Sequence, residues 1–144
     1  MNVRSCGKKM ERYLNDYFGF KPNMSDFSSD VSFVVYDEFD QRTTRALGGD
    51  YESSITFTIS KWNELSVEVY ISNARARRVA PYLGSILRKI NDANYFTLST
   101  PYIPGESSMS FRIWLEQVDE SNLYGALEDL LKAFGFALLE LDKI

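Results

Sequence analysis

The side chains available for chemistry in this sequence are mainly carboxylates and arginines, because the groups used in the commonest catalytic sites are missing. The chain has no histidine, which excludes Ser-His-Asp and Cys-His arrangements and metal sites built on imidazole. Its one cysteine, Cys6, cannot supply a set of thiolates for a metal or an internal disulfide. We therefore expect no cofactor, no metal and no histidine-based catalysis.

Acidic side chains gather around the polar segment 38–50 and are the remaining candidates for catalysis. Four of them could bind a cation or serve as acid and base: Asp37, Glu38, Asp40 and Asp50. Their spacing does not match a calcium-binding loop. Charged loop residues are usually solvated, so a carboxylate-based enzyme is the weakest interpretation. We predict that the chain is not an enzyme.

An arginine cluster, Arg75, Arg77 and Arg78, lies at the expected start of a helix. Cations at this end oppose the helix dipole, so the cluster does not serve helix stability. One interpretation is that it binds an acidic partner or a phosphate at the exposed helix end. The other is that it forms a solvated face, in which Arg75 and Arg78 pair with nearby acids.

Aromatic side chains on the polar face of the predicted sheet are the better candidates for binding. The alternation of residues directs three of them outward, on the same side as Arg112: Tyr36, Tyr70 and Trp114. Trp, Tyr and Arg are enriched among the residues that dominate protein interfaces. The alternative is that these aromatics pack on the loop 38–50 or on one another across strands.

Two periodicities define the elements that must position these residues. Strands are predicted where apolar and polar side chains alternate or aromatic residues gather: 31–37, 53–60, 65–72, 95–100 and 108–117. Helices are predicted where apolar residues recur at helical spacing: 8–18, 77–91, and from Asp119 or Ser121 onward. No linker or repeat divides residues 1–144, so we expect a single domain.

The order of these elements predicts an α+β fold, α-β-β-β-α-β-β-α. An antiparallel sheet of about five strands would carry helices on one face and leave the other face open. The last helix has an apolar stripe that must be buried: Leu123, Leu127, Leu130, Leu131, Phe134, Leu138 and Leu141. Gly135 leaves open whether the regular helix ends early.

Two asparagines, Asn91 and Asn94, stand between the predicted middle helix and the strand that follows. Asn tolerates the left-handed backbone that ends helices, and its amide can bond to carbonyl groups left unpaired there. We interpret both residues as structural caps rather than as a binding motif.

The order of elements over most of the chain resembles that of the YbjN family. The likeness rests on a helix ending in Ile90, Asn91 and Asn94, an aromatic strand at Phe96, the strand Phe111–Leu115 and the stripe Leu123–Phe134. It covers roughly residues 31–134 in element order. Proteins of this family are described as bacterial regulators of sensory transduction, and their fold is similar to that of class I type III secretion chaperones. The resemblance implies a non-enzymatic, protein-binding role and a homodimer, and it supplies no catalytic residue. The loop 38–50 and the arginine cluster depart from it.

The overall charge limits the partners that the chain can bind. A net charge of −4 and a pI near 4.9 disfavour nonspecific binding to nucleic acid or to an anionic membrane. No apolar run reaches membrane-spanning length, and the N-terminal residues contain no apolar signal core. We expect a cytoplasmic protein whose partner is another protein.

Two functions are the leading hypotheses. The first is a protein-binding module like YbjN and the secretion chaperones, which holds a partner segment on its open sheet face or in a dimer groove. The second is an immunity protein that neutralises a co-encoded bacterial toxin by covering its basic active site with an acidic surface. The residues expected to bind the partner are Tyr36, Tyr70, Trp114, Arg112, Arg75, Arg77 and Arg78.

Overall fold

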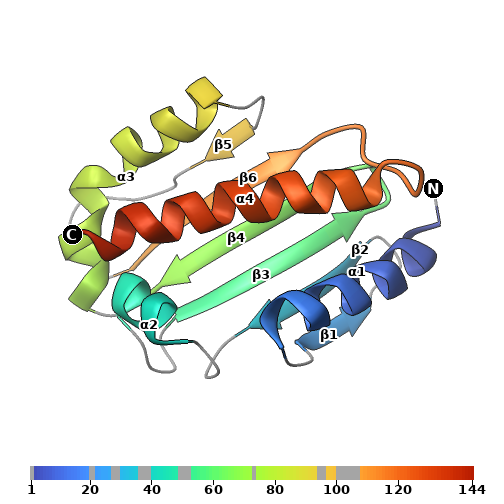
Figure 1. Cartoon of the computed structure of the whole chain (residues 1–144), viewed down its shortest axis with the longest axis horizontal. Helices are drawn as coiled ribbons and strands as arrows, with labels where there is room; N and C mark the ends of the chain where they lie inside the picture. Colours follow the sequence, from blue (N-terminus) through green and yellow to red (C-terminus); the bar gives the residue numbers. More distant parts are fainter. Residues whose placement is uncertain are drawn as a thin grey trace.

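A computed structural model shows an antiparallel sheet with helices packed on one of its faces (Figure 1). It describes residues 2–19, 22–26, 30–35, 40–48, 53–72, 74–93, 97–99 and 108–144. At positions 25–26, 34–35, 91–93 and 97–99 it describes the backbone alone.

Within these residues, six strands pair in the order β1-β2-β3-β4-β6-β5, and every pairing is antiparallel. The strands are β1 (Asn23–Asp26), β2 (Asp30–Val35), β3 (Ser53–Ser60), β4 (Leu65–Ile71), β5 (Thr97–Ser99) and β6 (Met109–Leu115). The helices are α1 (Val3–Phe18), α2 (Gln41–Leu47), α3 (Ala74–Ala93) and α4 (Leu123–Asp142). The α+β class, the antiparallel sheet and the order of the predicted elements are confirmed.

Two short elements were not predicted. The segment 38–50, expected as a loop, contains α2, which follows the N-cap residue Asp40 and ends at Gly48 with a left-handed φ of 89°. Ala46 and Leu47 are buried, so the apolar residues of this helix join the core. The prediction of a loop was wrong because so short a helix shows too few turns for its period to stand out. The edge strand β1 has a mostly polar sequence without alternation, so no pattern marked it.

Helix α1 begins at Val3, well before the predicted start at residue 8. Asn2 is the N-cap, and its side-chain oxygen accepts a hydrogen bond of 3.0 Å from the backbone N–H of Ser5. The earlier start brings Cys6 into the core, where the thiol is fully buried. Gly19 ends the helix in the left-handed conformation, as the sequence indicated.

The apolar faces of the strands and helices meet in one core. In β3, β4 and β6 the inward-facing residues of the alternation are all buried, and so is the whole predicted stripe of α4. The ring of Phe57 in β3 meets that of Phe134 in α4 edge to face, with 5.7 Å between centroids. Gly135 lies inside α4, which runs on to Asp142, so this glycine does not end the helix.

Helix α4 begins later in the chain than either predicted start, Asp119 or Ser121. The helix begins at Leu123 after Asn122, whose side chain makes no capping bond. Asp119 instead organises the preceding turn, where its carboxylate accepts hydrogen bonds from the backbone N–H groups of Ser121 and Asn122.

Helix α3 begins at Ala74, before the predicted start at residue 77, and Pro81 lies inside it. Proline has no backbone N–H, so the carbonyl group of Arg77 loses its usual helical donor. Figure 1 shows α3 bending between its first and second halves, as expected of a helix with an internal proline.

Asn91, one of the two asparagines proposed as caps, lies near the other end of α3. The helix continues past Asn91 to Ala93, so Asn91 belongs to the last turn and does not end the helix. Asn94 lies outside the described residues.

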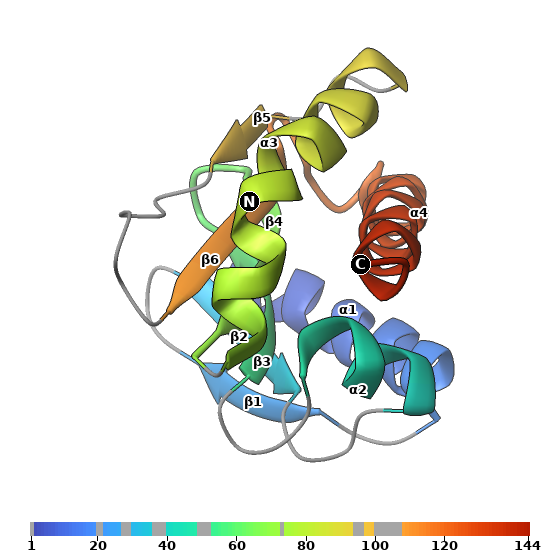
Figure 2. The same cartoon turned by 90° about the vertical axis from the view of Figure 1, so that its left-hand side faces the viewer.

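Helices α1, α2 and α4 lie on one side of the sheet, and α3 packs against α4 (Figure 2). The opposite side, which we call the open face, carries hydroxyl, charged and aromatic side chains from the central strands. Its described members are Ser32, Ser54, Thr56, Thr58, Ser66, Glu68, Tyr70, Ser110, Arg112 and Trp114.

Candidate protein-binding surface on the sheet

The register of β4 and β6 sets the side chains of the open face in adjacent rows. Ser66 lies opposite Trp114, and Glu68 lies opposite Arg112. Tyr70 follows in the next row along β4. Because side chains two residues apart share a face of a strand, Tyr70, Arg112 and Trp114 all lie on the open face. This is the orientation that the sequence alternation indicated.

Arg112 links an acidic side chain to the indole of Trp114. Its guanidinium carbon lies 4.7 Å from the centroid of the Trp114 ring, and its Nη2 atom lies 3.5 Å from Oε2 of Glu64. A cation–π contact at a partly exposed site contributes about 0.5–1 kcal/mol. The two contacts hold both large side chains in a fixed orientation, so less side-chain entropy remains to be lost on binding.

Small hydroxyl side chains surround this pair. The hydroxyl groups of Ser32 and Thr58 lie 2.9 Å apart across β2 and β3 and share a hydrogen bond. Ser66 is only 4% exposed although it lies on the open face, opposite Trp114. The open face therefore carries short polar side chains next to the partly buried ring of Trp114.

Tyr70 lies on the same face of β4 as Ser66, farther along the strand. It is 40% exposed, and it lies roughly 13 Å along β4 from Ser66, given a rise of about 3.3 Å per residue. Tyr36, the third aromatic residue predicted to bind a partner, lies outside the described residues. The structure thus brings Tyr70, Arg112 and Trp114 onto one surface.

Arg75 does not belong to this surface, in contrast to its predicted role in partner binding. Its guanidinium is partly buried and donates three hydrogen bonds to backbone carbonyl oxygens: Ala46 at 3.1 Å, Ile144 at 2.7 Å and Leu141 at 2.6 Å. Burial lowers its pKa from the ordinary arginine value, and the nearby charge of Arg78 adds to this effect. The nearby carboxylate of Asp142 acts on this pKa in the opposite direction.

Arg77 and Arg78 are exposed on the first turns of α3, as expected. Arg88 and Tyr82 on the same helix are exposed too, and the sequence reasoning did not single them out. The spacing in the sequence could have indicated that Tyr82 is exposed, because it follows Arg78 by one helical turn and so lies on the same face of the helix. Within the described part of the chain, no ion pair is formed by Arg77, Arg78 or Arg88.

The acidic residues considered for catalysis do not form a described cluster. Asp40 caps α2, where its Oδ1 atom accepts a hydrogen bond of 2.7 Å from the backbone N–H of Thr43. Asp37, Glu38 and Asp50 lie outside the described residues. Among the residues that are described, no group of three or more His, Cys, Asp or Glu side chains could hold a metal ion.

No helix in the described ranges is long and apolar enough to cross a bilayer.

Comparisons with known proteins give this chain no family. No family model, no curated protein and no solved structure matches it. The resemblance to the YbjN family therefore rests on the residues that suggested it and stays a hypothesis.

Proposed function

We propose that this chain is a non-enzymatic, cytoplasmic protein-binding module that uses its open sheet face. The observation that supports this proposal best is the pairing of Arg112 with Trp114 on a sheet face that also carries Tyr70, Glu68 and several small hydroxyl groups. Trp, Arg and Tyr are the residue types that most often dominate the binding energy of protein interfaces. Here all three types lie on one face, beside side chains too short to obstruct a partner.

The exposed arginines of α3 add a second element to the proposal. Arg77 and Arg78 lie just after β4, the strand that carries Tyr70. Charges at the rim of an interface change the association rate more than the final affinity. We therefore assign partner steering to Arg77 and Arg78, and anchoring to Trp114 and Arg112.

Affinity capture with two matched tryptophan variants tests the proposal. Trp114→Ala removes the proposed anchor. Trp62→Ala removes a tryptophan that is 66% exposed in the turn between β3 and β4, where it contacts Lys61. Partners captured by the wild type and identified by mass spectrometry are then titrated by calorimetry. We expect Trp114→Ala to weaken binding at least about tenfold, as for an interface anchor, and Trp62→Ala to leave it nearly unchanged. Unchanged partners and affinities with Trp114→Ala would contradict the proposal.

The nature of the captured partner separates the two hypotheses on function. A YbjN-like or secretion-chaperone-like role predicts a homodimer that binds an extended segment, which light scattering and limited proteolysis of the complex would reveal. An immunity protein predicts a tight 1:1 complex with a folded toxin. That role needs free acidic groups, whereas Glu140 and Asp142 on α4 already pair with Lys89 and Arg45 of this chain. We therefore favour the first.

A further inference from the structure

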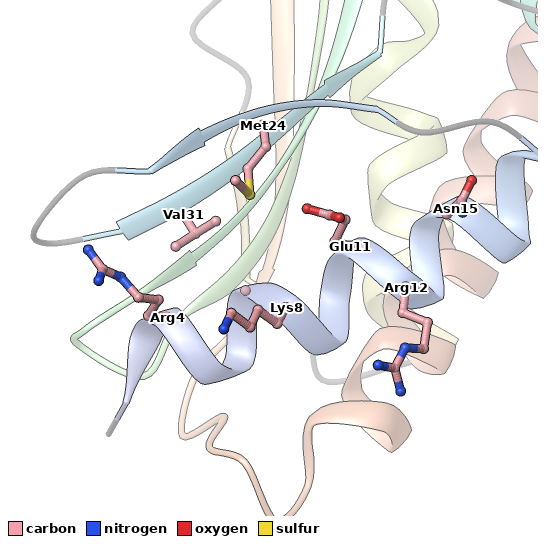
Figure 3. A pocket seen from close by; sticks show the side chains of 8 residues that line it. Arg4, Lys8, Glu11, Arg12, Asn15, Met24 and Val31 are labelled. Carbon is pink, nitrogen blue, oxygen red and sulfur yellow. The ribbon is translucent and has the colours of Figure 1, made fainter.

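A cleft of about 750 Å³ lies between α1 and the edge of the sheet formed by β1 and β2 (Figure 3). Gly7 of α1 and Val31 of β2 line it and are buried. Met24 of β1 is 49% exposed, and Figure 3 shows its side chain directed from the strand toward the helix. The cleft therefore combines an apolar floor with an exposed, adaptable methionine at the sheet edge.

The helix side of the cleft is basic. Arg4, Lys8 and Arg12 follow one another at four-residue spacing along α1, and all three are exposed. Figure 3 places Arg4 and Lys8 at one end of the cleft, while Arg12 points away from the strands. Glu11 is the one acidic residue among the lining residues that the structure describes. In this described lining, basic side chains outnumber acidic ones, although the net charge of the chain is −4.

The strand side of the cleft is an edge of the described sheet. β1 pairs with β2 and is the outermost strand in the sheet order. An edge strand presents alternating N–H and C=O groups that can pair with another extended chain. Met24 lies opposite Phe33, a buried residue of the helix-covered face. A strand added to β1 would therefore direct every second side chain toward α1 and the cleft.

We propose that the β1 edge and this cleft bind an extended, acidic segment of a partner protein, which joins the sheet as an additional strand. Backbone pairing to β1 supplies affinity for any extended peptide. Arg4 and Lys8 select acidic side chains at the positions that face the helix. A nucleic acid fits less well, because a phosphate backbone cannot reproduce the alternating donors and acceptors of a strand. This surface is separate from Trp114 and does not depend on the open-face proposal.

A fluorescent ten-residue peptide that alternates Glu with Thr tests the inference by fluorescence anisotropy. Reversing both charges, Arg4→Glu with Lys8→Glu, should weaken binding by about tenfold. Arg42→Glu with Arg88→Glu is the matched control, because it makes the same change in net charge at two exposed positions on α2 and α3 that belong to neither proposed surface. We expect this control to change the affinity by less than about twofold at physiological salt, where distant charges are screened. A peptide with Gln in place of Glu should bind the wild type as weakly as the Glu peptide binds the cleft variant.

Hydrogen exchange on the wild type tests the backbone pairing without relying on the folding of a variant. Binding of the Glu-Thr peptide should slow exchange in Asn23–Asp26, and methylating alternate backbone nitrogens of the peptide should abolish that protection. The inference is overturned if no binding occurs at about 1 mM peptide, if the Gln peptide binds equally well, or if the Arg42 and Arg88 control loses as much affinity. It is also overturned if the amides of β1 gain no protection.

Discussion

The Nη2 atom of Arg75 donates a hydrogen bond of 2.6 Å to the carbonyl oxygen of Leu141, a residue 66 positions away in the sequence. The same guanidinium bonds to the carbonyl oxygens of Ile144 and Ala46. The last carbonyl groups of a helix have no partner within the helix, and the helix dipole is negative there. One side chain at the start of α3 thus joins the carboxyl ends of α2 and α4.

Arg75→Lys should therefore destabilise the fold. A lysine keeps the charge but cannot direct a planar fork of donors at three carbonyl oxygens. We expect the free energy of unfolding to fall by about 2 kcal/mol, the scale of hydrogen bonds to a charged group, as measured by urea denaturation. Arg77→Lys is the matched control on the same helix, and its effect should stay within about 0.5 kcal/mol. Equal effects of the two variants would contradict this role for Arg75.

Gly7 allows α1 to pack closely on β2, and Gly7→Ala should be destabilising. A Cβ atom at this position would lie 3.0 Å and 3.1 Å from the two γ carbons of Val31. Such a clash in a packed core costs about 1–3 kcal/mol, which thermal or urea denaturation would measure.

Two further variants give this prediction its controls. Gly84→Ala places a methyl group in open space within α3 and should stabilise the protein by up to about 1 kcal/mol. Val31→Ala removes the atoms that clash, so the double variant Gly7→Ala with Val31→Ala should lose less stability than the two single changes added together. Additive losses would show that the Gly7–Val31 contact is not the cause.

Asp40 should stabilise α2 in a manner that depends on pH. The hydrogen bond from the Thr43 backbone N–H lowers the pKa of the Asp40 carboxyl, and the charges of Arg42 and Arg45 lower it further. A carboxyl whose pKa is lowered by folding contributes stability above its unfolded pKa and loses it as pH falls through the folded pKa. We expect Asp40→Ala to cost about 1 kcal/mol at pH 7, with a smaller difference below about pH 4.

The variant Asp40→Asn distinguishes the effect of the capping hydrogen bond from the effect of the carboxylate charge. Asparagine is also a good N-cap but does not titrate. Its stability relative to Asp40→Ala should therefore stay constant across the same acidic range, measured by urea denaturation at each pH. A wild-type advantage over Asp40→Ala that persists unchanged at pH 3 would argue against this account.

Cys6 should make the protein less stable at alkaline pH. Burial raises the pKa of the Cys6 thiol above its ordinary value, and the negative charge of Glu120 acts in the same direction. The unfolded chain ionises this thiol above about pH 8.5 while the folded chain keeps it protonated. Stability is therefore complete below the unfolded pKa and falls as pH rises toward the folded one.

Urea denaturation under reducing conditions between about pH 7 and 9.5 measures this loss. Cys6→Ala should be less stable than the wild type at pH 7, because it leaves a small cavity. Its stability should decline less steeply with pH, since it has no thiol to titrate. Parallel declines of the wild type and the variant would assign the effect to other groups.

The sequence by itself determined the class of the fold, the main strands of the sheet and most of the core. The alternation in β3, β4 and β6 and the stripe of α4 repeat over enough residues to identify each element and its buried face. The same alternation directed Tyr70, Arg112 and Trp114 outward. These properties are periodic, so they can be read along a single segment of chain.

Only the tertiary structure decided what depends on contacts between distant segments. The sequence indicated a surface cation at Arg75, whereas in the structure its guanidinium bonds to carbonyl oxygens at the carboxyl ends of α2 and α4. The cleft beside Arg4 and Lys8 exists because β1, a strand without a sequence signal, joins the sheet next to α1. Side-chain charge and residue spacing are local properties of the sequence. The groups that a charged side chain contacts depend on the packing of segments that are distant in the sequence.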